Sequence, residues 1–427
     1  MFVIFFCSRL ICTREIAEYF GVTNNVAINP TNSQILLAAT GSGVWRSTNG
    51  GQTWTLVTPG IAYDVQFHPT DGQKAVAGFH DSGVMFTTNG GVTWTASTGL
   101  GTRHRSEVRY ARSAPTTVYC ASADAGLIKV YRSLDGGATF ALVTTGAGVA
   151  NYEAYNDVLW VDPTNANTLV VGGVYLWRST NSGATFTQFY TAIHADMHAI
   201  VDDPAYNGST NRRVFFGTDG GIYRVNDSTL NGATALNNNL GITQFYGAVM
   251  NPSTGQILAG AQDNGTVRAT NNPQGWNSVF GGDGVYCEYD PTNSNYWYGG
   301  VYYAQIFRST TGGPNGQYIY SGIADAGSAA TCNFIPFMVL DPNNANRFLI
   351  GARSLWRSDN VKAATPTWSL IKPTIQPGDS SGGGKDAAHP PRQRPIAIQR
   401  LGEPAPDVVV RVAILWHGGS QPQQRHR

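Results

Sequence analysis

The sequence predicts an all-β fold made of repeated four-stranded antiparallel sheets, and two observations support that prediction. Glycine contributes 50 of the 427 residues, and aromatic residues make up 11% of the chain. Gly-rich turns between aromatic and β-branched runs are typical of many short strands. Prolines that close an apolar run recur every ~40–50 residues, which is the length of a four-stranded propeller blade. We therefore expect a β-propeller of about seven or eight blades.

The repeat has a fixed internal order. An apolar strand ends at a proline, and a second strand, an aromatic-Arg-Ser triplet, a Gly-rich turn and a Thr-Trp or Thr-Phe pair follow. The marker prolines are Pro30, Pro69, Pro115, Pro163, Pro204, Pro252, Pro291 and Pro342. The pattern predicts one propeller over residues 25–371, after an irregular lead-in over 1–24. Residues 372–427 are rich in Pro, Gly, Arg and Gln, and we interpret them as a disordered tail or a non-native end.

Composition narrows the function classes. Charged residues are 13% of the chain, against roughly 25% in an ordinary domain. A net charge of +1 excludes the basic footprint of a nucleic-acid-binding protein. No apolar run reaches the ~18 residues of a membrane span. Five widely spaced cysteines indicate buried side chains rather than a disulfide framework. The few charges and many Asn, Thr, Ser and Tyr residues favour a secreted or cell-surface protein.

Four turns share the frame Ser/Thr-x-Asn/Asp-x-Gly-x-Thr-Trp/Phe, at residues 47–54, 87–94, 133–140 and 179–186. They resemble the Asp-box, also called the bacterial neuraminidase repeat. The Asn or Asp side chain is expected to accept backbone N–H groups within the turn, and the Trp or Phe to pack between blades. Asp135 is therefore interpreted as a structural residue, on the face opposite the one that binds ligands.

Acidic and amide side chains recur in the loops of the other face, where the connections between blades meet those between second and third strands. Asp64 and Asp157 are assigned to inter-blade loops, and Asn264 to a second-to-third connection. Like charges around a concave mouth raise one another's pKa or hold a cation. We interpret these three residues as substrate-binding.

One cluster has the composition of a metal site. His194, Asp196 and His198 alternate, so on a strand they would project to one side and could bind a divalent cation. The alternative is a hydrogen-bonded polar lining of the channel. The sequence implies no other cofactor.

A second resemblance concerns residues 217–224, Gly-Thr-Asp-Gly-Gly-Ile-Tyr-Arg. They look like the Thr-Asp-x-Gly-Gly-x-Tyr-Arg segment of xyloglucan-degrading glycoside hydrolases, which are also built from Asp-box propellers. The resemblance implies a catalytic carboxylate at Asp219. Glycoside hydrolysis needs a second carboxyl group, for which Asp263, Asp283 and Asp196 are candidates. Those enzymes pair two propellers and are much longer than this chain.

Other Asp-box families suggest different uses. The chain lacks the Arg-Ile-Pro segment of sialidases, while sortilin-type receptors and photosystem assembly factors are not catalytic. The sequence thus predicts an extracytoplasmic propeller that binds a polysaccharide or glycan at an acidic channel mouth. Hydrolysis of β-glucan-type polysaccharide is the activity that the second resemblance implies. The alternative is a non-catalytic binding, adhesion or assembly propeller with a protein partner.

Overall fold

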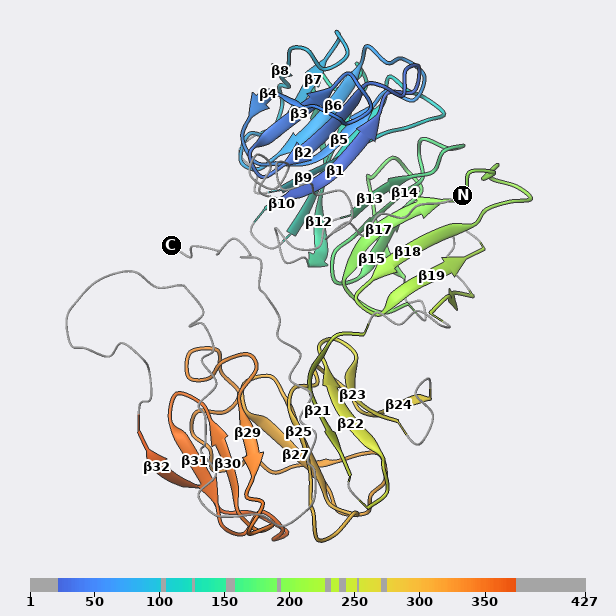
Figure 1. Ribbon diagram of the computed structural model, residues 1–427. Helices are drawn as coiled ribbons and strands as arrows, with labels where there is room; N and C mark the ends of the chain where they lie inside the picture. The colour runs from blue at the N-terminus through green and yellow to red at the C-terminus, as the bar shows by residue number, and fades with distance from the viewer. Residues whose placement is uncertain are drawn as a thin grey trace, which may run out of the picture. The chain divides into compact units, whose positions relative to one another are not determined.

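The structure is a computed structural model. It describes residues 22–100, 105–124, 127–150, 158–189, 193–226, 232–237, 243–251, 253–269 and 275–373. The regular elements of these residues are 32 β-strands (Figure 1). The chain divides into two compact units, residues 1–240 and 241–427, and each is described by itself.

The first unit contains five four-stranded sheets, which we number 1 to 5 in chain order. Their strands are β1 (Thr23–Ile28), β2 (Leu36–Thr40), β3 (Gly43–Ser47), β4 (Thr55–Pro59), β5 (Ala62–Phe67), β6 (Ala75–Phe79), β7 (Val84–Thr87), β8 (Thr95–Ala96), β9 (Arg105–Tyr110), β10 (Val118–Asp124), β11 (Leu127–Ser133), β12 (Ala141–Ala150), β13 (Val158–Val161), β14 (Leu169–Gly172), β15 (Leu176–Ser179), β16 (Thr187–Phe189), β17 (Met197–Asp202), β18 (Val214–Thr218), β19 (Gly221–Val225) and β20 (Thr234–Ala235).

The second unit contains three more sheets, numbered 6 to 8. Their strands are β21 (Phe245–Met250), β22 (Ile257–Ala261), β23 (Gly265–Ala269), β24 (Trp276–Phe280), β25 (Cys287–Tyr289), β26 (Trp297–Val301), β27 (Gln305–Ser309), β28 (Gln317–Tyr318), β29 (Met338–Leu340), β30 (Phe348–Gly351), β31 (Leu355–Ser358) and β32 (Ser369–Lys372).

Every sheet has the same topology, because its four strands pair with their sequence neighbours in antiparallel order. Four consecutive antiparallel strands of this length are a propeller blade. The predicted all-β propeller class is therefore confirmed, with eight blades among the described residues. We call "upper" the end of a blade where its first strand begins and where its second strand turns into its third. The hairpin between the third and fourth strands is at the "lower" end.

The hydrophobic core of each unit lies between successive blades. In the first unit, Leu37 of β2 packs in one cluster with Val65 and Phe67 of β5. In the second unit, Leu258 of β22 packs in one cluster with Trp297 of β26. Full burial of each such side chain contributes about 1.5–3 kcal/mol. Blade-to-blade packing of this kind fixes the first strand of each blade against the blade before it.

The lower-end turns make the predicted local hydrogen bonds. Asn49 Oδ1 accepts the Thr53 N–H at 2.9 Å, and Asn49 Nδ2 donates to Thr53 Oγ1 at 2.8 Å. Asp135 accepts the Thr139 N–H at 2.9 Å and the Thr139 hydroxyl at 2.6 Å. The turns of blades 2 and 4 make the equivalent bonds. These contacts explain why the same residue types recur at one spacing.

The repeated arginines join neighbouring blades. Arg46 Nε donates to Gly90 O at 2.8 Å, in the lower turn of the next blade. Arg308 donates to Ala363 O at 2.8 Å and also to Val361 O in the lower turn of blade 8. The arginine of the aromatic-Arg-Ser triplet therefore joins successive blades at these two places.

The predictions on the cysteines and on membrane-spanning segments can be compared with the structure. Cys120, Cys287 and Cys332 are buried. In the part of the chain that is described, no helix is long and apolar enough to cross a membrane. Most of the predicted lead-in and almost all of the predicted tail lie outside the described residues.

Candidate functional site

The same β-bulge occurs at the upper end of blades 1, 2, 5 and 6. In each, the pairing of the first strand with the second shifts by one residue, and the extra residues are Asn24, Tyr63, His198 and Tyr246. A bulge breaks the alternation of side chains along a strand and redirects one of them. Bulges are found beside active sites, so we take Tyr63, His198 and Tyr246 as candidate functional positions. Asn24 of blade 1 instead joins two blades, because its Nδ2 donates to Ala62 O at 2.7 Å.

In blades 2, 5 and 6 the bulge residue contacts the first residue after the second strand of its own blade. In blade 2 the contact is between two rings whose centroids are 5.9 Å apart. In blade 5 it joins an imidazole to a carboxylate, and in blade 6 a phenol to an amide. The pairs are Tyr63–His80, His198–Asp219 and Tyr246–Gln262. The same type of bulge therefore positions three chemically different side-chain pairs.

The pair in blade 5 contains the aspartate of the glycoside-hydrolase-like segment. Asp219 lies in the turn between β18 and β19. The His198 Nε2–H donates to Asp219 Oδ1 at 2.5 Å. The two side chains are 25% and 15% exposed for His198 and Asp219. Asp219 is therefore a solvent-reachable carboxylate whose orientation is fixed by the imidazole, which is the arrangement needed to accept a proton from a bound hydroxyl or water.

The three-ligand metal arrangement is not supported by this geometry. β17 begins at Met197, so only His198 lies on the strand, and Asp196 has a left-handed backbone with φ of 62°. The predicted alternation over the three residues is therefore wrong. His194 Nδ1–H donates to the Ala195 carbonyl at 3.0 Å. Among the described residues, His194, Asp196 and His198 do not bring one ligand atom each within 4.8 Å of one another.

Two more of the predicted carboxylates meet in the second unit. Asp263 lies in the turn between β22 and β23, and Asp283 precedes β25. The Asp263 backbone N–H donates to Asp283 Oδ1 at 2.7 Å. Asn264, next in the turn, is exposed, and its Nδ2 donates to Gln262 O at 3.1 Å. Both aspartates are partly exposed; Asp263 lies in the upper turn of blade 6 and Asp283 in the connection from blade 6 to blade 7.

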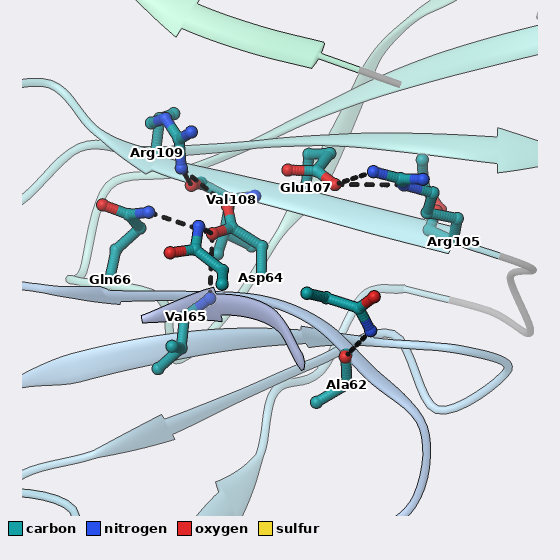
Figure 2. Close-up of polar contacts among 11 residues, drawn as sticks. Ala62, Asp64, Val65, Gln66, Arg105, Glu107, Val108 and Arg109 are labelled. Atoms are coloured by element: carbon teal, nitrogen blue, oxygen red, sulfur yellow. Dashed lines mark hydrogen bonds and ion pairs between the residues drawn. The ribbon is translucent and has the colours of Figure 1, made fainter. Parts of the chain in front are cut away.

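We expected Asp64 in an inter-blade loop, but it lies within β5, where its side chain is 0% exposed (Figure 2). Its Oδ1 accepts the Val65 N–H at 2.8 Å and Gln66 Nε2 at 2.9 Å. Its Oδ2 accepts the Val108 N–H at 3.0 Å and Arg109 Nη1 at 2.7 Å. Because these contacts join blade 2 to blade 3 and leave no surface for a ligand, Asp64 is a structural residue. Asp157, the other loop aspartate, lies outside the described residues.

Glu107 is a titratable residue of this region that sequence reasoning missed. It is buried in β9, and Arg105 donates to its Oε1 from Nε at 3.0 Å and from Nη2 at 2.8 Å (Figure 2). Burial raises the pKa of Glu107 to about 7, against the opposing attraction of Arg105. The Arg105 guanidinium also lies 5.0 Å from the centre of the Tyr63 ring. The sequence does carry a signal for Glu107, since it is a charged residue between Ser106 and Val108 on a short strand.

The fold and these upper ends define a class: a β-propeller whose polar and acidic side chains gather in the loops opposite the structural turns. No family model matches the chain, and no curated protein matches it. Among solved structures it is similar to a GH74 enzyme of Niastella koreensis, with 21% identity and a TM-score of 0.51 over 82% of this chain. It covers 63% of that enzyme, so it spans less than two thirds of the length of its relative.

A second solved structure, the GH74 xyloglucanase of Xanthomonas campestris, is 13% identical, with a TM-score of 0.26 over 82% of this chain and 70% of the other. At these identities the likeness to the Niastella enzyme establishes a shared fold, and activity has to be argued from the residues of the site.

Proposed function

We propose that the chain is a glycoside-hydrolase-like propeller that binds and cleaves β-glucan-type polysaccharide, with Asp219 as a catalytic carboxylate. The observation that carries the proposal is the His198–Asp219 pair, a fixed and solvent-reachable carboxylate at the upper end of blade 5. It lies in the Gly-rich segment that resembles the catalytic segment of xyloglucan-degrading enzymes. Because polysaccharides of this kind are extracellular, the proposal includes a secreted or cell-surface location.

Glycoside hydrolysis requires two carboxyl groups in different protonation states. Asp219 supplies one, with His198 fixing its orientation. Asp263 and Asp283 are the other proposed carboxyl groups, on the sequence pattern alone; within the second unit they lie together and are partly exposed. Asn264 is proposed as a hydrogen-bonding partner for sugar hydroxyls. Asp64 is not part of the proposal, because its carboxylate is enclosed by protein donors.

The test is release of reducing ends from soluble β-glucans by wild type and by the Asp219→Asn variant. Asp219→Asn keeps the size of the side chain but removes its charge, and we expect the rate to fall at least about 100-fold. Asp135→Asn is the matched control, since three other lower-end turns carry Asn at this position; its rate should equal that of wild type. The Asp263→Asn and Asp283→Asn variants are assayed in the same way.

Two outcomes would contradict the proposal. Undiminished cleavage by Asp219→Asn would remove this residue from the chemistry. Binding of the glucans by wild type without any release of reducing ends would replace the proposal by the alternative, a non-catalytic binding propeller.

A further inference from the structure

Tyr246 places a half-buried phenol beside the two carboxylates of blade 6. It is the bulge residue of β21, and its hydroxyl donates to Gln262 Oε1. Burial, with a further contribution from the charges of Asp263 and Asp283, raises the pKa of Tyr246 to about 12. The phenol is therefore a neutral hydrogen-bonding group, and its partner Gln262 directly precedes Asp263 in the chain.

An aromatic pair continues this surface across the next two blades. A Cβ at Gly247 would lie 2.8 Å from Cδ1 of Tyr286, so the absence of a side chain there lets the Tyr286 ring pack onto β21. The rings of Tyr286 and Phe337 meet edge to face, with centroids 5.3 Å apart. Phe337 is nonetheless 48% exposed. A large aromatic side chain that is held in place and still open to solvent is typical of a binding surface.

These residues come from equivalent places in three successive blades. Tyr246 is in the first strand of blade 6, Tyr286 directly precedes β25, and Phe337 directly precedes β29. The three side chains therefore belong to the upper ends of neighbouring blades in one unit. Tyr286 contacts both Phe337 and Gly247, the residue that follows Tyr246 in β21, so it links the three blades.

We propose that Tyr246, Tyr286 and Phe337, together with Asp263 and Asp283, bind a chain of neutral pyranose sugars. Aromatic faces pack against the C–H faces of sugar rings, and the carboxylates accept hydrogen bonds from hydroxyl groups. The two negative charges disfavour acidic sugars such as uronates, since like charges repel. An apolar peptide would place apolar atoms against two carboxylates, so a polyhydroxylated ligand fits the surface better. This inference deepens the proposed function and rests on it for the substrate class.

The test is calorimetric titration of the full chain with cellohexaose, in an Asp219→Asn background that prevents cleavage. We expect Phe337→Ala to weaken binding by about tenfold or more, because a large aromatic residue that is held in place and still exposed carries much of the affinity of such a surface. Tyr318→Ala is the matched control. Tyr318 is 49% exposed, lies in the fourth strand of blade 7 and should leave the dissociation constant unchanged. Circular dichroism of each variant establishes that it is folded.

A folded Phe337→Ala variant that binds cellohexaose as tightly as its parent would overturn the proposal. So would equal affinity for oligogalacturonate, which carries a carboxylate on each ring. The two proposals fail separately. Absence of cleavage with intact, Phe337-dependent binding would refute only the hydrolase, whereas cleavage that is unaffected by Phe337→Ala would refute only this surface.

Discussion

Replacing Asp64 tests whether one buried carboxylate joins blades 2 and 3. Its two oxygens accept the backbone N–H groups of Val65 and Val108, and the side chains of Gln66 and Arg109. Asn25 of blade 1 also donates to it, at 2.5 Å. Three blades therefore depend on a single acceptor group.

The cost of Asp64→Ala follows from which donors lose their partner. Gln66 and Arg109 are partly exposed and can bind water instead. Val65 and Val108 are 0% exposed, so both backbone N–H groups would stay buried without an acceptor. Each orphaned donor costs about 1–3 kcal/mol, which gives about 4 kcal/mol for the pair. That is a large part of the ~5–15 kcal/mol that stabilises an ordinary domain.

Urea unfolding monitored by tryptophan fluorescence measures this loss. Asp64→Asn keeps the volume but places an NH₂ group where two donors converge, so it should also be destabilised, by about 2 kcal/mol or more. Asp71→Ala is the control. Asp71 is an exposed aspartate of the same blade with a surface ion pair to Lys74, and its loss should cost at most about 1 kcal/mol. An Asp64→Asn variant as stable as wild type would refute the reasoning.

Three other predictions concern stability. The folded-state pKa of Glu107 is raised to about 7 from 4.5, so wild type should lose up to about 3 kcal/mol as pH rises between these values. Glu107→Gln should not show this loss, and parallel pH profiles of unfolding free energy would contradict the assignment. Burial alone would raise the pKa of Asp135, but hydrogen bonds from Ser133 and Thr139 lower it to about 2. The stabilisation is present above the ordinary pKa of 3.8 and is lost as pH falls through about 2; acid unfolding of Asp135→Asn should lack that step. A Cβ at Gly78 would lie 2.0 Å from a backbone oxygen of blade 3, so Gly78→Ala should lower the free energy of unfolding by about 1–3 kcal/mol, and an unchanged urea midpoint would show that the blades can separate to accept it.

The fold could be predicted because its signals are local. The Asn49 and Asp135 turns are complete within five residues, so their hydrogen bonds can be inferred from spacing alone. The same holds for the positions of Asp219 and Asp263, which follow from counting strands between turns. Asp64 was misplaced because the start of β5 depends on pairing with β6, which is not a local property.

The bulges and the aromatic surface could not be predicted for the same reason. A bulge appears only once the register of two strands is known, and nothing in the residues around His198 or Tyr246 announces the shift. Tyr286 and Phe337 are far apart in sequence, and their contact depends on the packing of two blades. A different error was made at residues 194–198. The alternation of His194, Asp196 and His198 was assigned to a strand, but β17 begins only at Met197.

Comparison of equivalent positions separates structure from function in this chain. At the lower ends, the same turn carries the same side chains and the same hydrogen bonds in blade after blade, because each turn has the same structural task. At the upper ends, the bulge is repeated while the residues that it presents differ, as the pairs of His198 with Asp219 and Tyr246 with Gln262 show. A backbone feature that is kept while its side chains vary has no common packing role to preserve. Under the proposed function, we expect substitutions at these positions to change binding or cleavage while leaving the blades folded.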